Sequence, residues 1–81
     1  MEEYESEEKA LLAACNLLGL SLEEVKQIKP KIVHYFFPED ATLEVYKVDE
    51  NLSFGVGFTR HHRGQNFYGL WLIEEEKVER I

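Results

Sequence analysis

The residues best suited to chemistry lie in one short basic stretch of an acidic chain. Arg60, His61, His62 and Arg63 supply two of the three arginines and two of the three histidines. Guanidinium groups bind phosphate or carboxylate through paired hydrogen bonds, and neighbouring imidazoles make such binding depend on pH near neutrality. These four residues and Lys26 are therefore candidates for contact with an anion or a nucleic acid. The alternative is a solvated turn that neutralises nearby acid.

Neither a metal centre nor a catalytic centre is predicted. His61 and His62 are adjacent, so they point in opposite directions in an extended chain, and no carboxylate or thiol stands at ligand spacing. Cys15 lies on an apolar helical stripe, which favours an inert buried thiol. His34 lies in an apolar strand and is typical of a core or edge histidine, although Glu44 on the next strand could partner it. We expect no enzyme, no metal and no cofactor.

Two short helices are predicted in the first thirty residues. Ser6 is an N-cap for a helix that runs to Leu18, where Gly19 supplies a stop. A capping box, Ser21–Glu24, starts a second helix at residue 22. Pro30 ends that helix because it excludes helical geometry from the preceding residue.

From residue 31 onward, a period of two and a β-branched, aromatic composition predict strands near residues 32–37, 42–48, 52–60 and 66–73. No helix separates these strands, so they must pair antiparallel through hairpins. We therefore expect an α+β fold, with an N-terminal αα-hairpin on one face of a three- to four-stranded antiparallel sheet. Residues 1–81 form a single domain with frayed ends at 1–5 and 79–81. The strand order, and whether 32–37 joins the sheet, stay open.

The strand at 42–48 has apolar residues on both faces. Leu43 and Val45 point to one side, while Tyr46 and Val48 point to the other. Either a β-bulge or a second buried face of the sheet is needed to satisfy both pairs.

The third strand alternates most cleanly, and its core face holds Leu52, Phe54, Val56 and Phe58. If the next hairpin loop has an even number of residues, Phe67, Trp71 and Ile73 join this core face. The opposite face then holds Tyr68, Leu70 and Leu72 beside Gly55 and Gly57. That apolar face predicts a contact surface for a second copy or another protein. The alternative is that Tyr68 fills the space over Gly57.

The two helices and their connection, through Cys15, Leu18-Gly19-Leu20, Val25 and Ile28, resemble the helix-turn-helix element of DNA-binding regulators. The resemblance implies a second helix that enters the major groove and exposes Ser21, Glu23, Lys26 and Gln27. The supporting third helix of that family is missing, because Pro30 leads into strands. An αα-hairpin that caps the sheet is the favoured alternative.

Composition limits the class of protein. At 81 residues there is room for one core, and 44% hydrophobic residues are too many for a disordered chain. The net charge of −7 comes mainly from residues 1–9 and 74–81, which predicts solvated ends. A single cysteine favours a reducing cytoplasm. The longest apolar stretch, residues 10–18, is far shorter than the ~20 residues of a membrane span, so we expect a soluble protein.

The sequence therefore favours a small non-catalytic protein-interaction or regulatory module that acts through an apolar sheet face, as a homodimer or as a subunit of a complex. The alternative is a nucleic-acid-binding regulator that uses the helix-turn-helix-like segment and the basic hairpin at 60–63. We expect a protein partner or self-association and no membrane contact.

Overall fold

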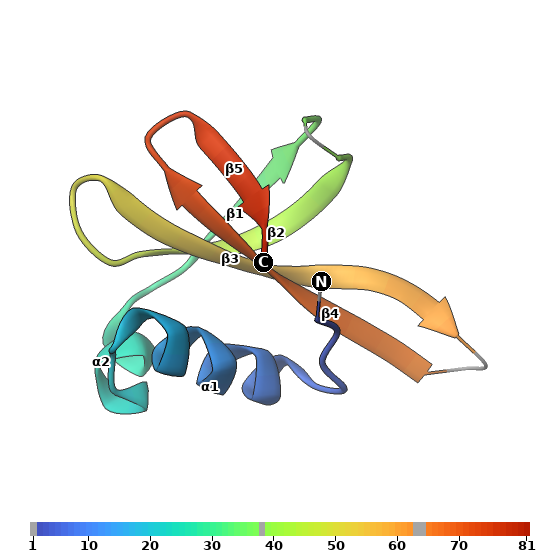
Figure 1. Ribbon diagram of the computed structural model, residues 1–81, viewed down its shortest axis with the longest axis horizontal. Coiled ribbons are helices and arrows are strands. Elements are labelled where there is room, and N and C mark those ends of the chain that lie inside the picture. Colours follow the sequence, from blue (N-terminus) through green and yellow to red (C-terminus); the bar gives the residue numbers. More distant parts are fainter. Residues whose placement is uncertain (1, 38, 63–64) are drawn as a thin grey trace.

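Two N-terminal helices pack on a curled, five-stranded antiparallel sheet that forms a half-barrel in the computed structural model (Figure 1). The structure describes residues 2–37, 39–62 and 65–81. Its elements are α1 (Glu7–Leu18), α2 (Leu22–Gln27), β1 (Lys31–Tyr35), β2 (Ala41–Lys47), β3 (Leu52–His62), β4 (Gln65–Glu74) and β5 (Lys77–Arg80). The predicted α+β class, with helices before strands, is confirmed.

Both helices begin at the predicted residues, and α1 ends at Leu18 as predicted, whereas α2 ends at Gln27, one residue earlier than expected. The Ser6 hydroxyl accepts a hydrogen bond from the Lys9 N–H at 3.1 Å, and Gly19 adopts the left-handed conformation with φ of 68° that ends α1. Ser21 and Glu24 form the reciprocal capping box, with both hydrogen bonds at 3.1 Å. Neither helix, in the part of the chain described, has the length and apolarity needed to cross a membrane.

The strands follow one another in the sheet in the order β1-β2-β3-β4-β5, each antiparallel to the next. The strand predicted at 32–37 joins the sheet as its first edge strand, β1. The prediction missed β5, because its four residues alternate too briefly to stand out. Residues near both ends of the described chain are hydrogen-bonded to β4: the Ile81 N–H donates to the Leu70 carbonyl at 3.0 Å, and Tyr4 exchanges two hydrogen bonds of 2.8 Å with Tyr68.

The sheet buries apolar side chains on both faces. The larger core lies under the helices and is built around Ala10, Ala14, Cys15, Val25, Tyr46, Phe54, Val56 and Leu70. A smaller core fills the concave face and is built around Leu43, Trp71 and Ile73. Leu43 and Tyr46 thus point to opposite buried faces, so the second buried face, and not a bulge, resolves the two-sided pattern of β2.

Two glycines of β3 permit the close approach of β2 that curls the sheet. A Cβ atom built on Gly55 would lie 2.7 Å from the Leu43 side chain. One built on Gly57 would lie 2.6 Å from the Thr42 backbone oxygen and 2.7 Å from Leu43. Glycine inside a strand is typical of such close contacts, since it has no side chain to keep the neighbouring strand and its Leu43 side chain away.

A β-bulge at Thr59 sets the faces of β4. Beyond the bulge, His62 pairs with Gln65 across the two-residue loop, which has the even length assumed from the sequence. Phe58 nevertheless pairs with Tyr68, because Thr59 is skipped in the pairing of β3 with β4, which shifts the register by one residue. The Thr59 hydroxyl lies 3.1 Å from the Phe67 carbonyl oxygen, which it can satisfy by donation.

We predict that Gly57→Ala destabilises the fold by about 1 to 3 kcal/mol, the usual range for an overpacked core. Gly55→Ala should cost less, because its new methyl group meets the movable end of the Leu43 side chain, whereas Gly57→Ala meets backbone. Urea unfolding followed by the fluorescence of the single tryptophan, Trp71, measures both. Equal losses for the two variants would contradict this account of the curl.

Candidate interaction surface

The apolar surface predicted on β4 is not exposed. Tyr68, Leu70 and Leu72 pair with Phe58, Val56 and Phe54, respectively, so all lie on the helix-covered face of the sheet. Leu70 is 0% exposed. The face assignment from the sequence is therefore wrong, because the bulge at Thr59 reverses the faces of residues 68–74 relative to residues 52–58 of β3.

Gly55 and Gly57, predicted beside that surface, lie on the opposite face under Leu43. The alternative, in which Tyr68 fills the space over Gly57, is also wrong, since Tyr68 stacks on Phe58 with ring centroids 4.8 Å apart. The structure thus separates the glycines from the three apolar residues.

The basic hairpin lies at the far end of β3 and β4. Arg60, His61 and His62 lie in β3, which extends two residues further than predicted, but their side chains fall outside what the structure describes. Arg63 lies outside the described residues. Lys26 is exposed in the last turn of α2. Contact of this group with an anion or a nucleic acid therefore stays a prediction.

The α1–α2 hairpin caps the sheet. Cys15 and Val25 are buried in the same core as β3 and β4, so the side of α2 that carries Val25 is occupied by packing. Burial raises the pKa of the Cys15 thiol, which disfavours the reactive thiolate. α2 has only six residues and exposes Glu23 and Glu24 beside Lys26. After Ile28 the described chain passes directly into β1.

A different apolar surface is exposed on the edge of the sheet. Ile32, Phe36 and Phe37 are 77, 70 and 83% exposed, and they lie within six consecutive residues. Ile32, His34 and Phe36 occupy alternate positions on the outer side of β1, and Phe37 follows directly. We call these four residues the β1 strip. Val33 and Tyr35, which alternate with them, are half-buried toward the concave core.

The β1 strip is exposed because of its place in the sheet. α1 packs on β3 and β4, so it does not cover the outer side of β1 (Figure 1). β1 pairs with β2 along one edge, and no described strand pairs with its other edge. His34 was predicted to be a core or edge histidine, so the exposed strip around it was not predicted. The lack of acid from Val25 to Phe37 is not a distinctive signal, since residues 52–73 also lack acid.

The His34 imidazole joins two residues of the β1–β2 hairpin. Its Nε2 contacts the Asp40 carboxylate, and its Nδ1 lies 2.6 Å from the Thr42 hydroxyl oxygen. The Phe36 ring meets it edge to face, with centroids 4.7 Å apart. Glu44, the partner considered from the sequence, instead pairs in register with Ile32.

This hydroxyl–imidazole–carboxylate chain has the order of groups found in nucleophilic triads. A neutral imidazole that donates from Nε2 to Asp40 would accept the Thr42 hydroxyl proton at Nδ1. The side chains of His34 and Asp40 are 41 and 76% exposed, so water rather than an enclosed site surrounds them. The arrangement is better suited to stabilising the β1–β2 hairpin, which carries the β1 strip, than to preorganised catalysis.

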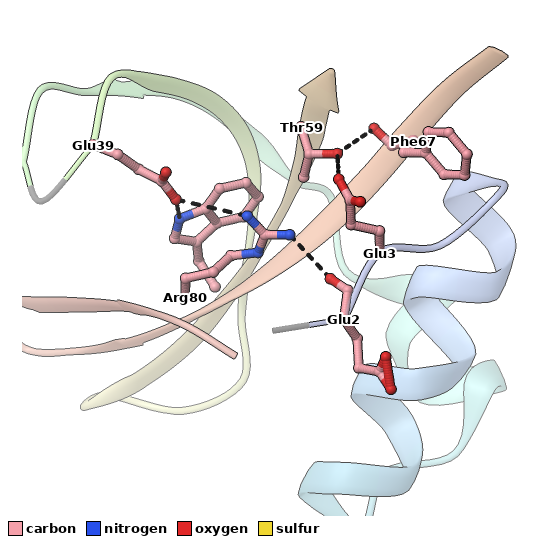
Figure 2. Close-up of polar contacts among 7 residues, drawn as sticks. Glu2, Glu3, Glu39, Thr59, Phe67 and Arg80 are labelled. Atoms are coloured by element: carbon pink, nitrogen blue, oxygen red, sulfur yellow. Dashed lines mark hydrogen bonds and ion pairs between the residues drawn. The ribbon is translucent and has the colours of Figure 1, made fainter. Parts of the chain in front are cut away.

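Arg80 ties three distant parts of the chain together on the concave side of the sheet. Figure 2 shows its guanidinium between Glu39 and the Glu2 carbonyl oxygen, which accepts a hydrogen bond at 3.0 Å. Arg80 Nη1 lies 3.8 Å from Glu39 Oε1, which also accepts from the Trp71 indole N–H at 3.1 Å. The guanidinium carbon lies 4.9 Å from the Trp71 ring centroid. This cluster fixes the chain after β1 against β4 and β5.

Two glutamates meet where α1 begins over β2. The pKa of Glu7 is raised, first by burial and then by the charge of Glu44 and a hydrogen bond between the two side chains. The pKa of Tyr46 is also raised, mainly by burial and then by Glu44 and Glu7. The contact between α1 and the sheet therefore favours a proton on Glu7.

A cavity of about 450 Å³ opens beside the start of α1 and is lined by Glu5, Ser6, Glu7, Asn66 and Tyr68. Two of its five lining residues are acidic, and the Ser6 hydroxyl is engaged in capping α1. The cavity is therefore poorly suited to an anion, although the start of a helix would otherwise favour one.

No family model, curated protein or solved structure gave a significant match to this chain.

We predict that Arg80→Met, which keeps the apolar stem, lowers the free energy of unfolding by about 1.5 to 3 kcal/mol, the range for hydrogen bonds to charged groups. Removal of the guanidinium from above the indole should also shift the Trp71 emission. Lys77→Met on the same strand is the control, because its side chain is 74% exposed. Unfolding and emission unchanged in Arg80→Met would show that the cluster does not hold the fold together.

The contribution of Glu7 to stability should rise as the pH falls from neutral through the raised pKa of its carboxyl group. The folded chain binds this proton more tightly than the unfolded chain, so the gain is complete below the ordinary value near 4.5. Glu7→Gln removes this dependence and is expected to be more stable at neutral pH than Glu8→Gln. Glu8 is the matched control, an exposed residue in the same helical turn. Identical pH profiles of thermal unfolding for the two variants would refute the coupling.

Proposed function

We propose that this chain is a non-catalytic protein-interaction module whose contact surface is the β1 strip. The observation that carries the proposal is three large apolar side chains, each at least 70% exposed, beside an edge of β1 that no strand in the described part of the chain pairs with. The module would act as a homodimer or as a subunit of a complex.

Exposed apolar side chains are common singly, but a contiguous group is typical of an interaction site. Full burial of each apolar side chain of the β1 strip would contribute about 1.5 to 3 kcal/mol to the free energy of binding. The free N–H and C=O groups of β1 can pair with an extended strand, while Ile32 and Phe36 supply side-chain contacts at alternate positions. Backbone pairing and apolar burial together suit protein recognition by strand addition.

Edge strands usually carry devices that prevent such pairing. Lys29 and Pro30 provide them just before β1, but none follows from Ile32 to Phe37. The part of the edge that carries no protection against pairing is thus also its apolar part, which supports the view that this edge binds a partner.

The nucleic-acid alternative has less support. Lys26 shares a six-residue helix with Glu23 and Glu24, whose charge repels phosphate. The chain holds sixteen acidic residues against nine lysines and arginines.

A reducing cytoplasm fits a protein whose single cysteine is buried and which needs no disulfide.

We predict that a photoreactive phenylalanine analogue, p-benzoylphenylalanine, at Phe36 forms a covalent adduct when the chain is illuminated in the cell that produces it. The same analogue at Leu17 is the control, because Leu17 is also apolar and 62% exposed but lies outside the β1 strip. Mass spectrometry of the adduct identifies the partner. An adduct with another copy or with a different protein supports the proposal, whereas equal labelling at both positions, or none at Phe36, contradicts it.

A further inference from the structure

We infer that the partner of the β1 strip is a second copy of this chain, with β1 of each copy paired antiparallel about Val33. This inference rests on the proposed function and specifies its partner. The two five-stranded sheets would then become continuous across a two-fold axis.

The strand geometry permits this pairing. Val33 is the middle residue of β1, which runs from Lys31 to Tyr35. A two-fold axis through Val33, perpendicular to the sheet, places Lys31 opposite Tyr35 of the other copy and Ile32 opposite His34. Opposed residues in an antiparallel pair lie on the same face of the sheet. The β1 strips of the two copies therefore form one apolar row on the outer face.

Charge favours a self-complementary antiparallel contact. The entrance to β1 carries Lys26, Lys29 and Lys31, whereas Glu39 and Asp40 follow its exit. Antiparallel pairing brings the basic entrance of each copy toward the acidic exit of the other. It also sets each lysine at position 31 against an aromatic ring, where a cation is favourable, and not against the same lysine.

The net charge of the chain points to the same surface. Two copies with a charge of −7 each repel one another wherever their acidic residues meet. Residues 25–37 contain three lysines and no aspartate or glutamate, so two copies can approach there with little repulsion. Residues 9–22 and 52–73 also lack acid and carry exposed apolar side chains, but they lie mainly in α1 and in β3 and β4, which already have a neighbouring strand on each side.

The opposite edge of the sheet is a poor competitor. β5 has four residues, and its exposed side chains, Lys77 and Glu79, are charged and paired with each other at 3.4 Å. Short, charged edge strands resist pairing with other chains. A β1-to-β1 contact uses the same edge of both copies and therefore stops at a dimer. A β1-to-β5 contact would instead leave one free edge on each copy, and it would build a filament unless the copies closed into a ring.

Sedimentation of the purified chain tests whether the dimer exists. We expect a dimer that Ile32→Glu weakens at least tenfold in dissociation constant and that Leu17→Glu leaves unchanged. Far-UV circular dichroism confirms that each variant is folded. A wild-type chain that sediments as a monomer at about 100 μM, or a dimer insensitive to Ile32→Glu, would overturn the inference; that concentration is roughly a hundred times the micromolar affinity of a weak specific complex.

A disulfide tests the register. In a Cys15→Ala background, Val33→Cys should form a covalent dimer under mild oxidation, because residues opposed in an antiparallel pair have Cα atoms within disulfide range. Tyr35→Cys is the matched control on the same side of β1, and it should stay monomeric. Stronger crosslinking through residue 35 would overturn the pairing about Val33.

The two proposals fail in distinguishable ways. A monomer in sedimentation, combined with an adduct of a different protein at position 36, overturns the self-pairing and keeps the interaction module. A monomer with no adduct at position 36 overturns both.

Discussion

The close approach of β2 to β3 over Gly55 and Gly57 is the constraint on which the other features of this fold depend. Leu43 lies against both glycines, at distances that leave no room for a side chain on either. The sheet curls as a result, and its concave face buries Leu43, Trp71 and Ile73 away from the helices. A chain of 81 residues with two short helices could not otherwise cover both faces of a sheet.

The curl also determines what is left exposed. The helices cover β3 and β4, the concave core takes the inner sides of β1 and β2, and the outer side of β1 has neither cover. Glu39 and Arg80 hold the segment after β1 onto Trp71, so the apolar residues before it are fixed at the edge of the sheet. The strip therefore lies between a strand that pairs with β2 and the anchored Glu39.

The sequence predicts those parts of this structure that local chemistry decides. Ser6, Gly19 and the Ser21–Glu24 capping box act within a few residues, and both helices were predicted within one residue. The faces of β4 could not be predicted, because they depend on whether Thr59 pairs or bulges, a choice made between two strands.

The candidate surface was only partly predictable, for a similar reason. The strand around His34 was found, but which of its sides is covered depends on where α1 lies across the sheet. Its actual partners, Asp40 and Thr42, follow from the hairpin register, which pairs His34 with Thr42 and places Glu44 beside Ile32. Contacts that join residues 2, 39 and 80 carry no local sequence signal at all.

The meeting of the two ends of the chain has a consequence for how the protein is made. Tyr4 and Ile81 both pair with β4, and Arg80 holds the Glu2 carbonyl across a separation of 78 residues. During synthesis from the N-terminus, α1 and the first hairpins can form early, because their contacts are close in sequence. Residues 2–4 have no place to bind until β4 and β5 have left the ribosome, so this segment is among the last parts of the domain to become ordered, although it is made before the helices.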